Sequence, residues 1–469
     1  MKKIIIIGGG IAGLACAYRI QEEIENGAGI QCEVLEASGH FGGKIHTESF
    51  DGFLVERGPD SFISQKPWAI QLCKKIGLAD RLTGTNPGQT KTYVYTGKRM
   101  VTMPDGLSLM IPTKFMPFAL SPLFSWAGKI RMGMDLFLPG KGDDKDESLA
   151  SFIRRRLGEE ALRKMAEPML AGIYASDPET MSIKSTFPMF YQAEQKYRSL
   201  ILGALARKRQ AGKQPAAPKG PSPFTLFMTL KNGLSEMTGR LLEKCPDISF
   251  RANVKVNEIS KNGEGWKLNL EEGDPLSADT VILATPAGIS AKMIRTSVPE
   301  TAELLEKIKY VSTATVSIAF RKEGFTHPLN GFGFVVPRNE GCKVLACTWT
   351  SSKFPSRVPE GYVMLRCFVG GATREELAEQ SSEEIEKMVR SELKDVMGID
   401  QEPVFCKVFH NRKSNVQYQV GHAELIEKIE ASLTKAKGLY LTGSAYHGIG
   451  IPDCVLDGTR TAEKVLQTG

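Results

Sequence analysis

The chain has 469 residues, of which 42% are hydrophobic and 24% charged, a composition that allows two or three globular domains with sizeable cores. Its formal net charge of +7 is too small a basic excess to indicate nucleic-acid binding. The nine cysteines form no Cys-x-x-Cys pair and have no zinc-like spacing with histidine, which predicts reduced thiols without a disulfide framework or metal site. Apolar runs are too short for a signal peptide or a membrane-spanning helix, so we expect a cytoplasmic protein.

The first 36 residues predict a dinucleotide-binding unit. A β-branched run, Ile4–Ile7, suits a buried parallel strand, and a glycine turn and a helical pattern follow it directly. Gly8 permits the tight turn, Gly10 lets a pyrophosphate approach the backbone, and Gly13 lets the helix pack close to the strand. A second strand ends at Glu36, the distance at which an acidic residue binds the ribose hydroxyls. A glycine-rich turn without a ligand is the plainer alternative.

Two loops after this unit bear on the choice between NAD and FAD. Phe41-Gly42-Gly43-Lys44 is a second glycine-rich segment carrying a cation, and Gly58-Pro59-Asp60-Ser61 follows it. Here the sequence resembles the flavin amine oxidase and protoporphyrinogen oxidase superfamily. The resemblance implies that the loop with Lys44 contacts the phosphates and ribose of FAD, and that the Gly58–Ser61 turn lies beside the isoalloxazine ring.

Two further segments predict strands in the middle of the chain. Residues 249–256 are expected as a strand that forms a hairpin with 266–270, and 279–286 as a buried strand of the same sheet as Ile4–Ile7. The hairpin resembles the one whose backbone reaches the adenine in the family, with Val254 at the matching position. Val254 as an ordinary core residue is the alternative.

The C-terminal segment predicts a strand at 438–444, a glycine turn, and a helix reaching Leu466. In the family this strand and helix start lie close to the ribityl chain and pyrimidine end of the flavin. The resemblance therefore implies FAD as the cofactor, held by Gly8, Gly10, Ile11, Ala12, Gly13, Glu36, Ala37, Gly43, Lys44, Gly58, Pro59, Asp60, Ser61, Val254, Gly443, Ser444, Gly450, Ile451 and Pro452.

The electron acceptor is inferred from two missing features. The sequence contains neither a second dinucleotide fingerprint for a nicotinamide nor a redox cysteine pair. We therefore expect an oxidase, in which reduced flavin passes its electrons to O2 and gives H2O2.

The middle of the chain points to the substrate. The stretch from Glu167 to Pro188, and Gly443-Ser444 where monoamine oxidases have Gly-Glu, resemble protoporphyrinogen and coproporphyrinogen oxidases. The resemblance implies a porphyrinogen substrate that loses a hydride from a methylene bridge to the flavin and a proton from a pyrrole. It also places Ile173 and Phe368 beside the substrate and makes Lys66 a partner for a propionate. Core packing and a surface charge are the alternatives for these residues, and no catalytic base is identified.

One departure from the family pattern bears on which porphyrinogen is oxidised. Eukaryotic protoporphyrinogen oxidases have an arginine where this chain has Thr92, so a propionate clamp is missing. The pattern resembles more closely the soluble enzymes of Gram-positive bacteria that oxidise coproporphyrinogen III to coproporphyrin III in haem synthesis. Protoporphyrinogen IX remains the close alternative. A flavin amine oxidase, a carotenoid desaturase and a non-catalytic flavoprotein are more distant ones.

The predicted fold combines α/β and α+β parts in three discontinuous regions. They are a Rossmann-type FAD-binding domain (1–64, 230–296 and 436–469), a mixed-sheet substrate domain (65–93, 206–229 and 297–435), and a mostly helical subdomain (94–205). Residues 107–139 are rich in apolar side chains and proline, which favours a core, with peripheral contact at the inner face of the cell membrane as the alternative. Residues 204–223 are expected to form a basic loop. Homo-oligomerisation stays open.

Overall fold

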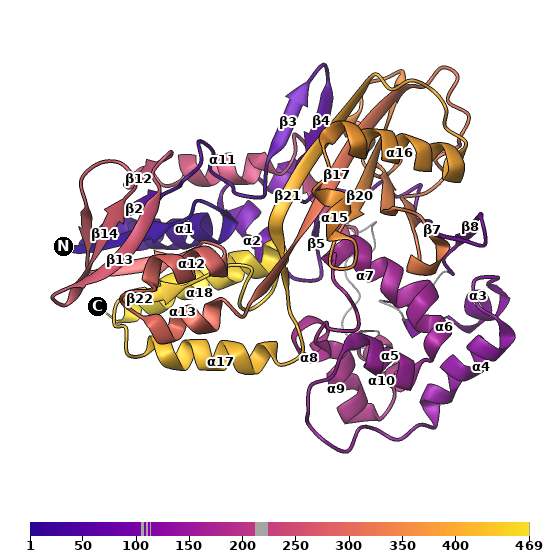
Figure 1. The fold of residues 1–469 in the computed structure, drawn as a ribbon, viewed down its shortest axis with the longest axis horizontal. Helices are drawn as coiled ribbons and strands as arrows, with labels where there is room; N and C mark the ends of the chain where they lie inside the picture. The colour runs from indigo at the N-terminus through magenta and orange to yellow at the C-terminus, as the bar shows by residue number, and fades with distance from the viewer. Residues whose placement is uncertain (105–106, 109–110, 113, 212–223, 469) are drawn as a thin grey trace. The chain divides into compact units, whose positions relative to one another are not determined.

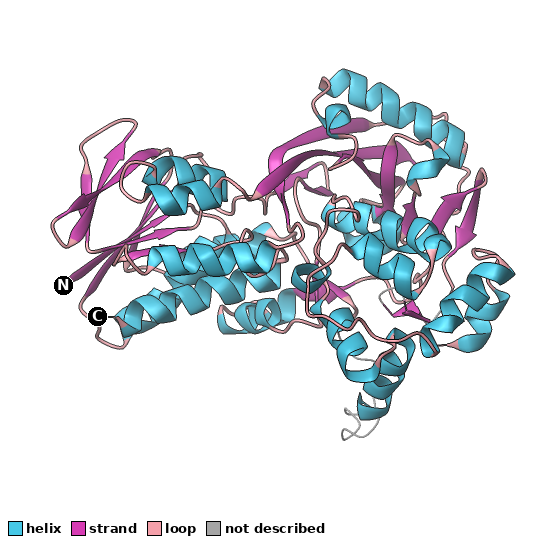
Figure 2. Ribbon diagram, turned by 60° about the horizontal axis from the view of Figure 1, so that its bottom comes forward, coloured by secondary structure: helices cyan, strands magenta, loops and turns pink. Residues whose placement is uncertain are grey.

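The computed structural model describes residues 1–104, 107–108, 111–112, 114–211 and 224–468. The chain forms two compact units, each assembled from separated segments. The first contains residues 1–85, 223–309 and 423–469, and the second contains residues 86–222 and 310–422. Both units combine helices and strands (Figure 2). The finer division predicted from the sequence, with a substrate domain and a helical subdomain beside the FAD-binding domain, stays a prediction.

A five-stranded parallel sheet forms the centre of the first unit (Figure 1). Its strand order is β12-β2-β1-β16-β22, and every neighbouring pair is parallel. The predicted strands at residues 4–7, 32–35, 279–286 and 438–444 all lie in this sheet, which confirms the Rossmann-type fold. The five strands are β1 (Lys2–Ile7), β2 (Ile30–Leu35), β12 (Ile248–Arg251), β16 (Thr280–Leu283) and β22 (Leu439–Leu441).

Glycines allow close packing around α1 (Ile11–Glu25), both with α18 (Ile451–Gln467) and with the turn after β1. A Cβ atom on Gly458 of α18 would lie 2.2 Å from the carbonyl oxygen of Ala12 in α1. A Cβ on Gly13 would lie 2.1 Å from the carbonyl oxygen of Gly8. No side chain fits at either position, so the predicted role of Gly13 in close helix packing agrees with the geometry.

The remaining described elements of the first unit surround this sheet and these two helices. The helices are α2 (Trp68–Lys75), α11 (Ser235–Glu243), α12 (Ala287–Ile294), α13 (Pro299–Leu305) and α17 (His422–Leu433). The strands form the small sheets β3 (Thr47–Phe50) with β4 (Phe53–Glu56), β5 (Phe62–Ile63) with β11 (Phe227–Leu230) and β6 (Leu82–Gly84), and β13 (Val256–Asn262) with β14 (Gly265–Leu270) and β15 (Leu276–Ala278).

The single strand predicted for residues 249–256 is wrong. β12 ends at Arg251 in the parallel sheet, whereas the hairpin partner of β14 is β13, which begins at Val256. Between them Asn253 has a left-handed backbone with φ +57°, a conformation that asparagine tolerates better than most residues. This turn separates two strands of different sheets. The apolar and polar alternation on either side of the turn gave no sign of it.

A seven-stranded mixed sheet forms the centre of the second unit, as expected for the substrate region. Its order is β21-β17-β20-β19-β18-β7-β8, and β18 with β7 is a parallel pair. Helix α16 (Ser382–Met397) lies against this sheet (Figure 1). Its buried Ile385 and Val389 belong to the same core as the sheet residues Val316 and Leu365. The strands are β7 (Thr92–Thr96), β8 (Arg99–Thr102), β17 (Lys309–Arg321), β18 (Gly333–Val335), β19 (Val344–Trp349), β20 (Tyr362–Gly370) and β21 (Phe405–Gln417).

Helices from residues 115–211 share a second core in this unit, around Phe152 and Phe190. A fully buried ion pair joins Arg156 to Asp135 beside this core, and Ser199 donates to the same aspartate. The longer helices are α3 (Phe115–Leu120), α4 (Trp126–Gly133), α5 (Leu149–Arg156), α7 (Glu167–Tyr174), α9 (Pro188–Tyr197) and α10 (Leu200–Ala211), and the short 3-10 helix η2 spans Met134–Leu136.

Helix α10 corrects the basic loop expected for residues 204–223. Residues 204–211 are helical because alanine, leucine, arginine and lysine are strong helix formers, and residues 212–223 lie outside the described part. Within the described helices, none is both long and apolar enough to cross a membrane. All nine cysteines are free thiols, and seven of them are buried.

Candidate cofactor site

The carboxyl ends of the parallel strands bring distant segments of the chain to one edge of the sheet. Gly8 follows β1, Glu36 follows β2, Ala284 follows β16 and Thr442 follows β22. Gly8 has φ +108°, and a Cβ there would lie 2.8 Å from the carbonyl oxygen of Ala284. This edge is where open α/β sheets bind their ligands, so the predicted cofactor residues are gathered at the position that the fold favours.

Glu36 is held by the turn that it faces. Its Oε2 accepts a 2.8 Å hydrogen bond from the amide of Gly9, and its Oε1 accepts from the amide and the hydroxyl of Ser38, each at 2.8 Å. A carboxylate has about four acceptor positions. Three are used here, which fixes the orientation of Glu36 and leaves one acceptor position, the one that the predicted ribose contact would use.

The N-terminus of α1 provides backbone donors at this edge. Gly10 is its N-cap residue and makes no side-chain cap, and the first turn contains no acidic residue. A Cβ on Gly10 would meet nothing within 4 Å, whereas a Cβ on Gly9 would collide with Phe41 at 2.4 Å. The space beside Gly10 is thus open to a ligand, whereas Phe41 fills the space beside Gly9. Uncapped amides with the positive end of the helix dipole suit a pyrophosphate, so the residues present fit a dinucleotide.

The two loops predicted to contact the cofactor pack against this turn and against each other. The amide of Gly42 donates to the carbonyl of Gly9 at 2.8 Å, and a Cβ on Gly43 would lie 3.1 Å from Cα of Gly10. A Cβ on Gly58 would lie only 1.9 Å from the carbonyl oxygen of Lys44. The structure therefore brings the turn at Gly8–Gly13, the Lys44 loop and the Gly58–Ser61 turn together.

Lys44 is exposed in the structure. The protein atoms around it nevertheless lower the pKa of its ammonium group by desolvation, and the nearby Cys454 acts in the opposite direction. Burial in turn raises the pKa of Cys454 to about 12, so that cysteine stays a neutral thiol. A cation with a desolvation cost is stabilised by an anion beside it, which agrees with the phosphate contact that the resemblance implies.

Val254 is fixed to the same edge through its backbone. Its amide donates a 2.9 Å hydrogen bond to the carbonyl of Glu36, one residue after the left-handed Asn253. Val254 is only partly buried. Its backbone lies next to Glu36, the ribose-binding candidate, and its contact with adenine stays a prediction.

The C-terminal turn, residues 442–450, leads from β22 into α18. Gly443 and Gly448 have φ +124° and +141°, which side-chain-bearing residues rarely adopt. Asp453 in the first turn of α18 accepts a 3.3 Å hydrogen bond from the amide of Gly450. Asp453 also accepts from Lys66 Nζ at 2.6 and 2.7 Å. Thus Lys66, predicted as a propionate partner, already has a carboxylate partner at the start of this helix.

Sequence reasoning did not find two functional candidates, Asp453 and Asp457. They are four residues apart in a predicted helix, a spacing that places both on one face. That spacing was the available signal. Asp457 bonds to Thr442, Gly443 and His447, which lie ten or more positions before it, so only the folded chain shows these partners.

The substrate candidates lie in different units. Lys66 belongs to the first unit, and Ile173 and Phe368 belong to the second. Phe368 is half-buried in β20, and the guanidinium of Arg366 lies 5.2 Å from the centroid of its ring. Ile173 lies in α7, but its side chain is outside the described part of the structure. Ile173 thus lies in a helix and Phe368 in a strand of the second unit, and the predicted substrate contacts of all three residues stay predictions.

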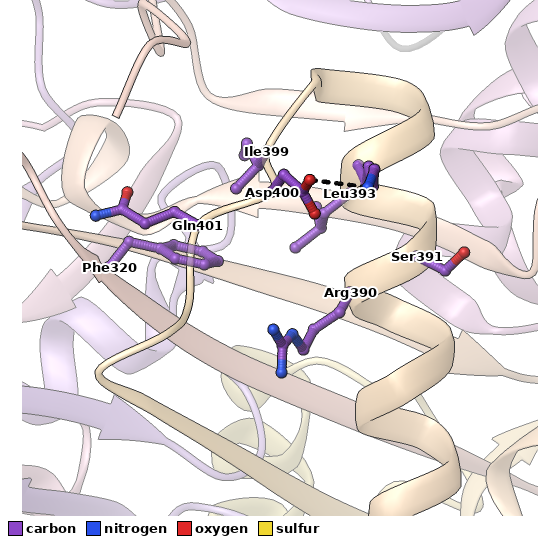
Figure 3. A pocket seen from close by; sticks show the side chains of 8 residues that line it. Phe320, Arg390, Ser391, Leu393, Ile399, Asp400 and Gln401 are labelled. Carbon is purple, nitrogen blue, oxygen red and sulfur yellow. Dashed lines mark hydrogen bonds and ion pairs between the residues drawn. The ribbon is translucent and has the colours of Figure 1, made fainter. Parts of the chain in front are cut away.

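A cavity of about 240 Å³ in the second unit is not the candidate site (Figure 3). It lies between α16 and the loop that follows it, and its cations are neutralised, because Lys394 pairs with Asp400 at 2.8 Å and Arg390 pairs with Glu402. None of its eight lining residues was predicted to bind cofactor or substrate: Phe320, Arg390, Ser391, Leu393, Lys394, Ile399, Asp400 and Gln401.

Comparison with known proteins agrees with this geometry. The family model described as flavin containing amine oxidoreductase matches residues 11–466. A coproporphyrinogen III oxidase of Bacillus subtilis (strain 168) is 38% identical over 99% of this chain and 98% of its own, and one of Staphylococcus aureus (strain NCTC 8325 / PS 47) is 33% identical over 99% of both. A crystal structure from Exiguobacterium sp. 255-15, whose name refers to protoporphyrinogen oxidase, superposes with a TM-score of 0.87 at 31% identity, covering 100% of this chain and 99% of that one.

The chain therefore belongs to the flavin-containing amine oxidoreductase family, and it is an FAD-dependent oxidoreductase. The Rossmann-type sheet, the uncapped N-terminus of α1 and the acceptor at Glu36 are the features of this chain that fit such a cofactor.

Proposed function

We propose that this protein oxidises coproporphyrinogen III to coproporphyrin III with FAD as cofactor and O2 as electron acceptor, releasing H2O2, in haem synthesis. The full-length similarity to the Bacillus subtilis enzyme is the observation that carries the proposal. The stretch from Glu167 to Pro188, which includes α7, supports it, because this stretch resembles porphyrinogen oxidases and not amine oxidases.

The proposed FAD site runs along the carboxyl edge of the parallel sheet. The amides at the start of α1 would hold the pyrophosphate, Glu36 a ribose hydroxyl, and the backbone at Val254 the adenine. The turn at residues 442–450 and the start of α18 would line the flavin end. Bound flavin supplies the hydride acceptor. The protein would fix the orientation of the flavin ring and exclude water from it.

Thr92 supports coproporphyrinogen III over protoporphyrinogen IX. It begins β7 in the second unit, and it is uncharged where eukaryotic protoporphyrinogen oxidases have an arginine. Without that arginine, one propionate contact found in the protoporphyrinogen oxidases is missing, which argues against protoporphyrinogen IX as the substrate. We keep Ile173 and Phe368 as proposed neighbours of the macrocycle.

The test supplies coproporphyrinogen III and protoporphyrinogen IX separately to the aerated holoenzyme and follows porphyrin fluorescence together with H2O2. We expect a higher kcat/KM with coproporphyrinogen III and H2O2 formed in proportion to the O2 consumed. Faster turnover of protoporphyrinogen IX would reverse the substrate assignment. Inactivity with both, in a protein that contains FAD, would refute the porphyrinogen oxidase function.

We also infer that the helical part of the second unit rests on an anionic lipid surface, so that the enzyme works at the inner face of the cell membrane. Residues 107–139 were expected mainly as core, and Phe118 and Met132 are indeed buried. Other large apolar side chains in this segment, however, are exposed: Met116 by 61%, Leu120 by 73%, Trp126 by 69%, Ile130 by 67% and Phe137 by 86%.

Four of these exposed side chains lie on α3 and α4, and Glu160, the acid that accepts from Ser125 at the start of α4, is paired with Lys164 at 2.8 Å. Lys129 joins α3 and α4, because its Nζ donates to the carbonyl of Ala119 at 2.6 Å and lies 4.4 Å from the Trp126 ring centroid. The cation Lys114 is exposed at the start of α3. Asp135, the one acid among residues 107–141, is fully buried in its ion pair with Arg156. An aromatic and apolar face flanked by cations suits the boundary of an anionic bilayer.

Sedimentation with phosphatidylglycerol vesicles and with phosphatidylcholine vesicles tests this surface. We expect the protein to bind phosphatidylglycerol vesicles, with an affinity that weakens as salt is added. The double variant Trp126→Ser/Phe137→Ser should lose about tenfold or more in vesicle affinity, because it lacks two aromatic side chains that would enter the bilayer boundary. Ile289→Ser, at a similarly exposed position in α12, is the matched control. Equal sedimentation of the double variant and the wild type would refute the inference.

A further inference from the structure

One carboxylate joins the beginning and the middle of the turn at residues 442–450 to α18. Asp457 Oδ2 accepts hydrogen bonds from the Thr442 hydroxyl and from the Gly443 amide, each at 2.8 Å. Its Oδ1 contacts His447 Nδ1 at 2.7 Å. Within the described residues, the beginning and the middle of the turn thus depend on one side chain located two helical turns into α18.

Asp457 is held in place independently of the turn. It is 8% exposed, and the next residue, Gly458, packs against the backbone of α1 so closely that no Cβ fits there. Thr442 is fully buried, and its amide donates to the carbonyl of Leu283 in β16 at 3.0 Å. The carboxylate therefore connects two rigid elements, the α1/α18 pair and the parallel sheet. The turn between them contains two glycines in the left-handed region, which have more backbone freedom than other residues, so the bonds to Asp457 restrict it.

We propose that Asp457 is a positioning residue for FAD: it holds the turn at residues 442–450 in the conformation that lines the flavin end of the cofactor. The proposal rests on the FAD site proposed above, because that site assigns the flavin end to this turn. Asp457 itself is not proposed to contact the cofactor. It acts through Gly443, whose amide it orients, and through His447.

His447 makes the effect of Asp457 dependent on pH. Its ring faces Asp457 on one side, and its Nε2 lies 3.4 Å from Glu430 of α17 on the other. Lys464, further along α18, is a cation that acts on it and lowers its pKa. The hydrogen bond to Asp457 outweighs burial and this cation, and so raises the pKa of His447. Protonated His447 forms a charge-assisted bond to Asp457, which stabilises the turn at low pH.

The test measures the rate of FAD release from the holoenzyme by the increase in flavin fluorescence. We expect Asp457→Ala to release FAD about tenfold faster or more, because three hydrogen bonds to a buried carboxylate are lost. Asp457→Asn should lie between this variant and the wild type, since one oxygen acceptor remains. Glu463→Gln, on an exposed part of the same helix, is the matched control and should release FAD at the wild-type rate.

Two further variants keep the proposal falsifiable if Asp457→Ala does not fold. Thr442→Val removes a single bond to Asp457 with little change of shape, and it should release FAD about threefold faster. His447→Gln, at a half-exposed position, should remove the pH dependence of release that the wild type shows. A readout of pH dependence separates positioning of the turn from a general loss of stability.

Gly10→Val distinguishes failure of this inference from failure of the FAD site. If Gly10→Val loses FAD while Asp457→Ala and Thr442→Val retain it as the wild type does, the site is correct and the role of Asp457 is refuted. If Gly10→Val also retains FAD, the proposed site itself is wrong, and the inference fails with it. Faster release in the Asp457 and Thr442 variants, with normal release in Glu463→Gln, supports the proposal.

Discussion

The amide of Gly9 donates a 2.8 Å hydrogen bond to Oε2 of Glu36, so the glycine turn after β1 and the end of β2 are joined by the protein itself. The two residues are 27 positions apart in the chain. A carboxylate oriented in this way loses little entropy when it binds a ribose hydroxyl, which is why its bonds within the protein matter for cofactor affinity.

Glu36→Gln should weaken FAD binding about tenfold or more. The glutamine amide nitrogen cannot accept the bonds that Gly9 or Ser38 donates, and hydrogen bonds to a charged group contribute about 1.5–3 kcal/mol each. Quenching of flavin fluorescence on titration of the protein with FAD measures the dissociation constant. Glu33→Gln, on the same strand with its carboxylate paired to Arg251, is the control. Equal affinities of the two variants would show that Glu36 does not bind the cofactor.

Alanine at Gly10 and at Gly13 should have opposite consequences. Gly10→Ala places its Cβ in open space and should change the free energy of unfolding without FAD by no more than about 1 kcal/mol, yet weaken FAD binding. Gly13→Ala places its Cβ 2.1 Å from the Gly8 carbonyl oxygen and should destabilise the protein by about 3 kcal/mol. Urea unfolding and FAD titration of both variants check this. Similar stability of the two would contradict the packing argument.

Lys66 and Asp453 should have opposite effects on KM if Lys66 binds a propionate. Lys66→Met leaves Asp453 without the ammonium at 2.6 Å and should raise the KM for coproporphyrinogen III several-fold. Asp453→Asn releases the ammonium from its carboxylate and should lower KM. Steady-state kinetics with FAD in excess provide the measurement. Unchanged KM values in both variants, accompanied by faster FAD loss, would assign the pair to holding α18 instead.

The stability of the protein should depend on pH through His447. Because the pKa of His447 is raised in the folded state, its contribution is fully present below the unfolded value of about 6.5 and is lost as pH rises through the folded value. Wild-type Tm minus His447→Gln Tm should therefore fall as pH rises above about 6.5. Thermal unfolding at a series of pH values measures this difference.

His46 provides a control, because its pKa is shifted in the opposite direction from that of His447. Burial, His40 and Arg57 lower its pKa, so its protonation opposes folding as pH falls through the folded value. Wild-type Tm minus His46→Gln Tm should accordingly become smaller or negative at low pH. The same trend with pH in both variants would show that the local charges around His447 do not set its effect.

The sequence by itself determined the Rossmann-type core and the class of protein. Strand, glycine turn, helix and Glu36 are local in the chain, and their periodicity and steric requirements can be read without a structure. The FAD cofactor followed from the resemblance of the loops around Lys44 and Gly58. The helix 204–211 was missed because its basic charge and the neighbouring glycines and prolines suggested a loop, although its own residues favour a helix.

Only the tertiary structure decided which distant residues act together. The break at Asn253 depends on a left-handed backbone that places residues 248–251 and 256–262 in different sheets, and the local pattern is compatible with one strand. The pairing of Lys66 with Asp453, separated by 387 positions, and the bonds from Asp457 to the turn require helix α18 to be seated on α1. Such contacts depend on the packing of whole elements, so they cannot be inferred from the residues that are adjacent in the sequence.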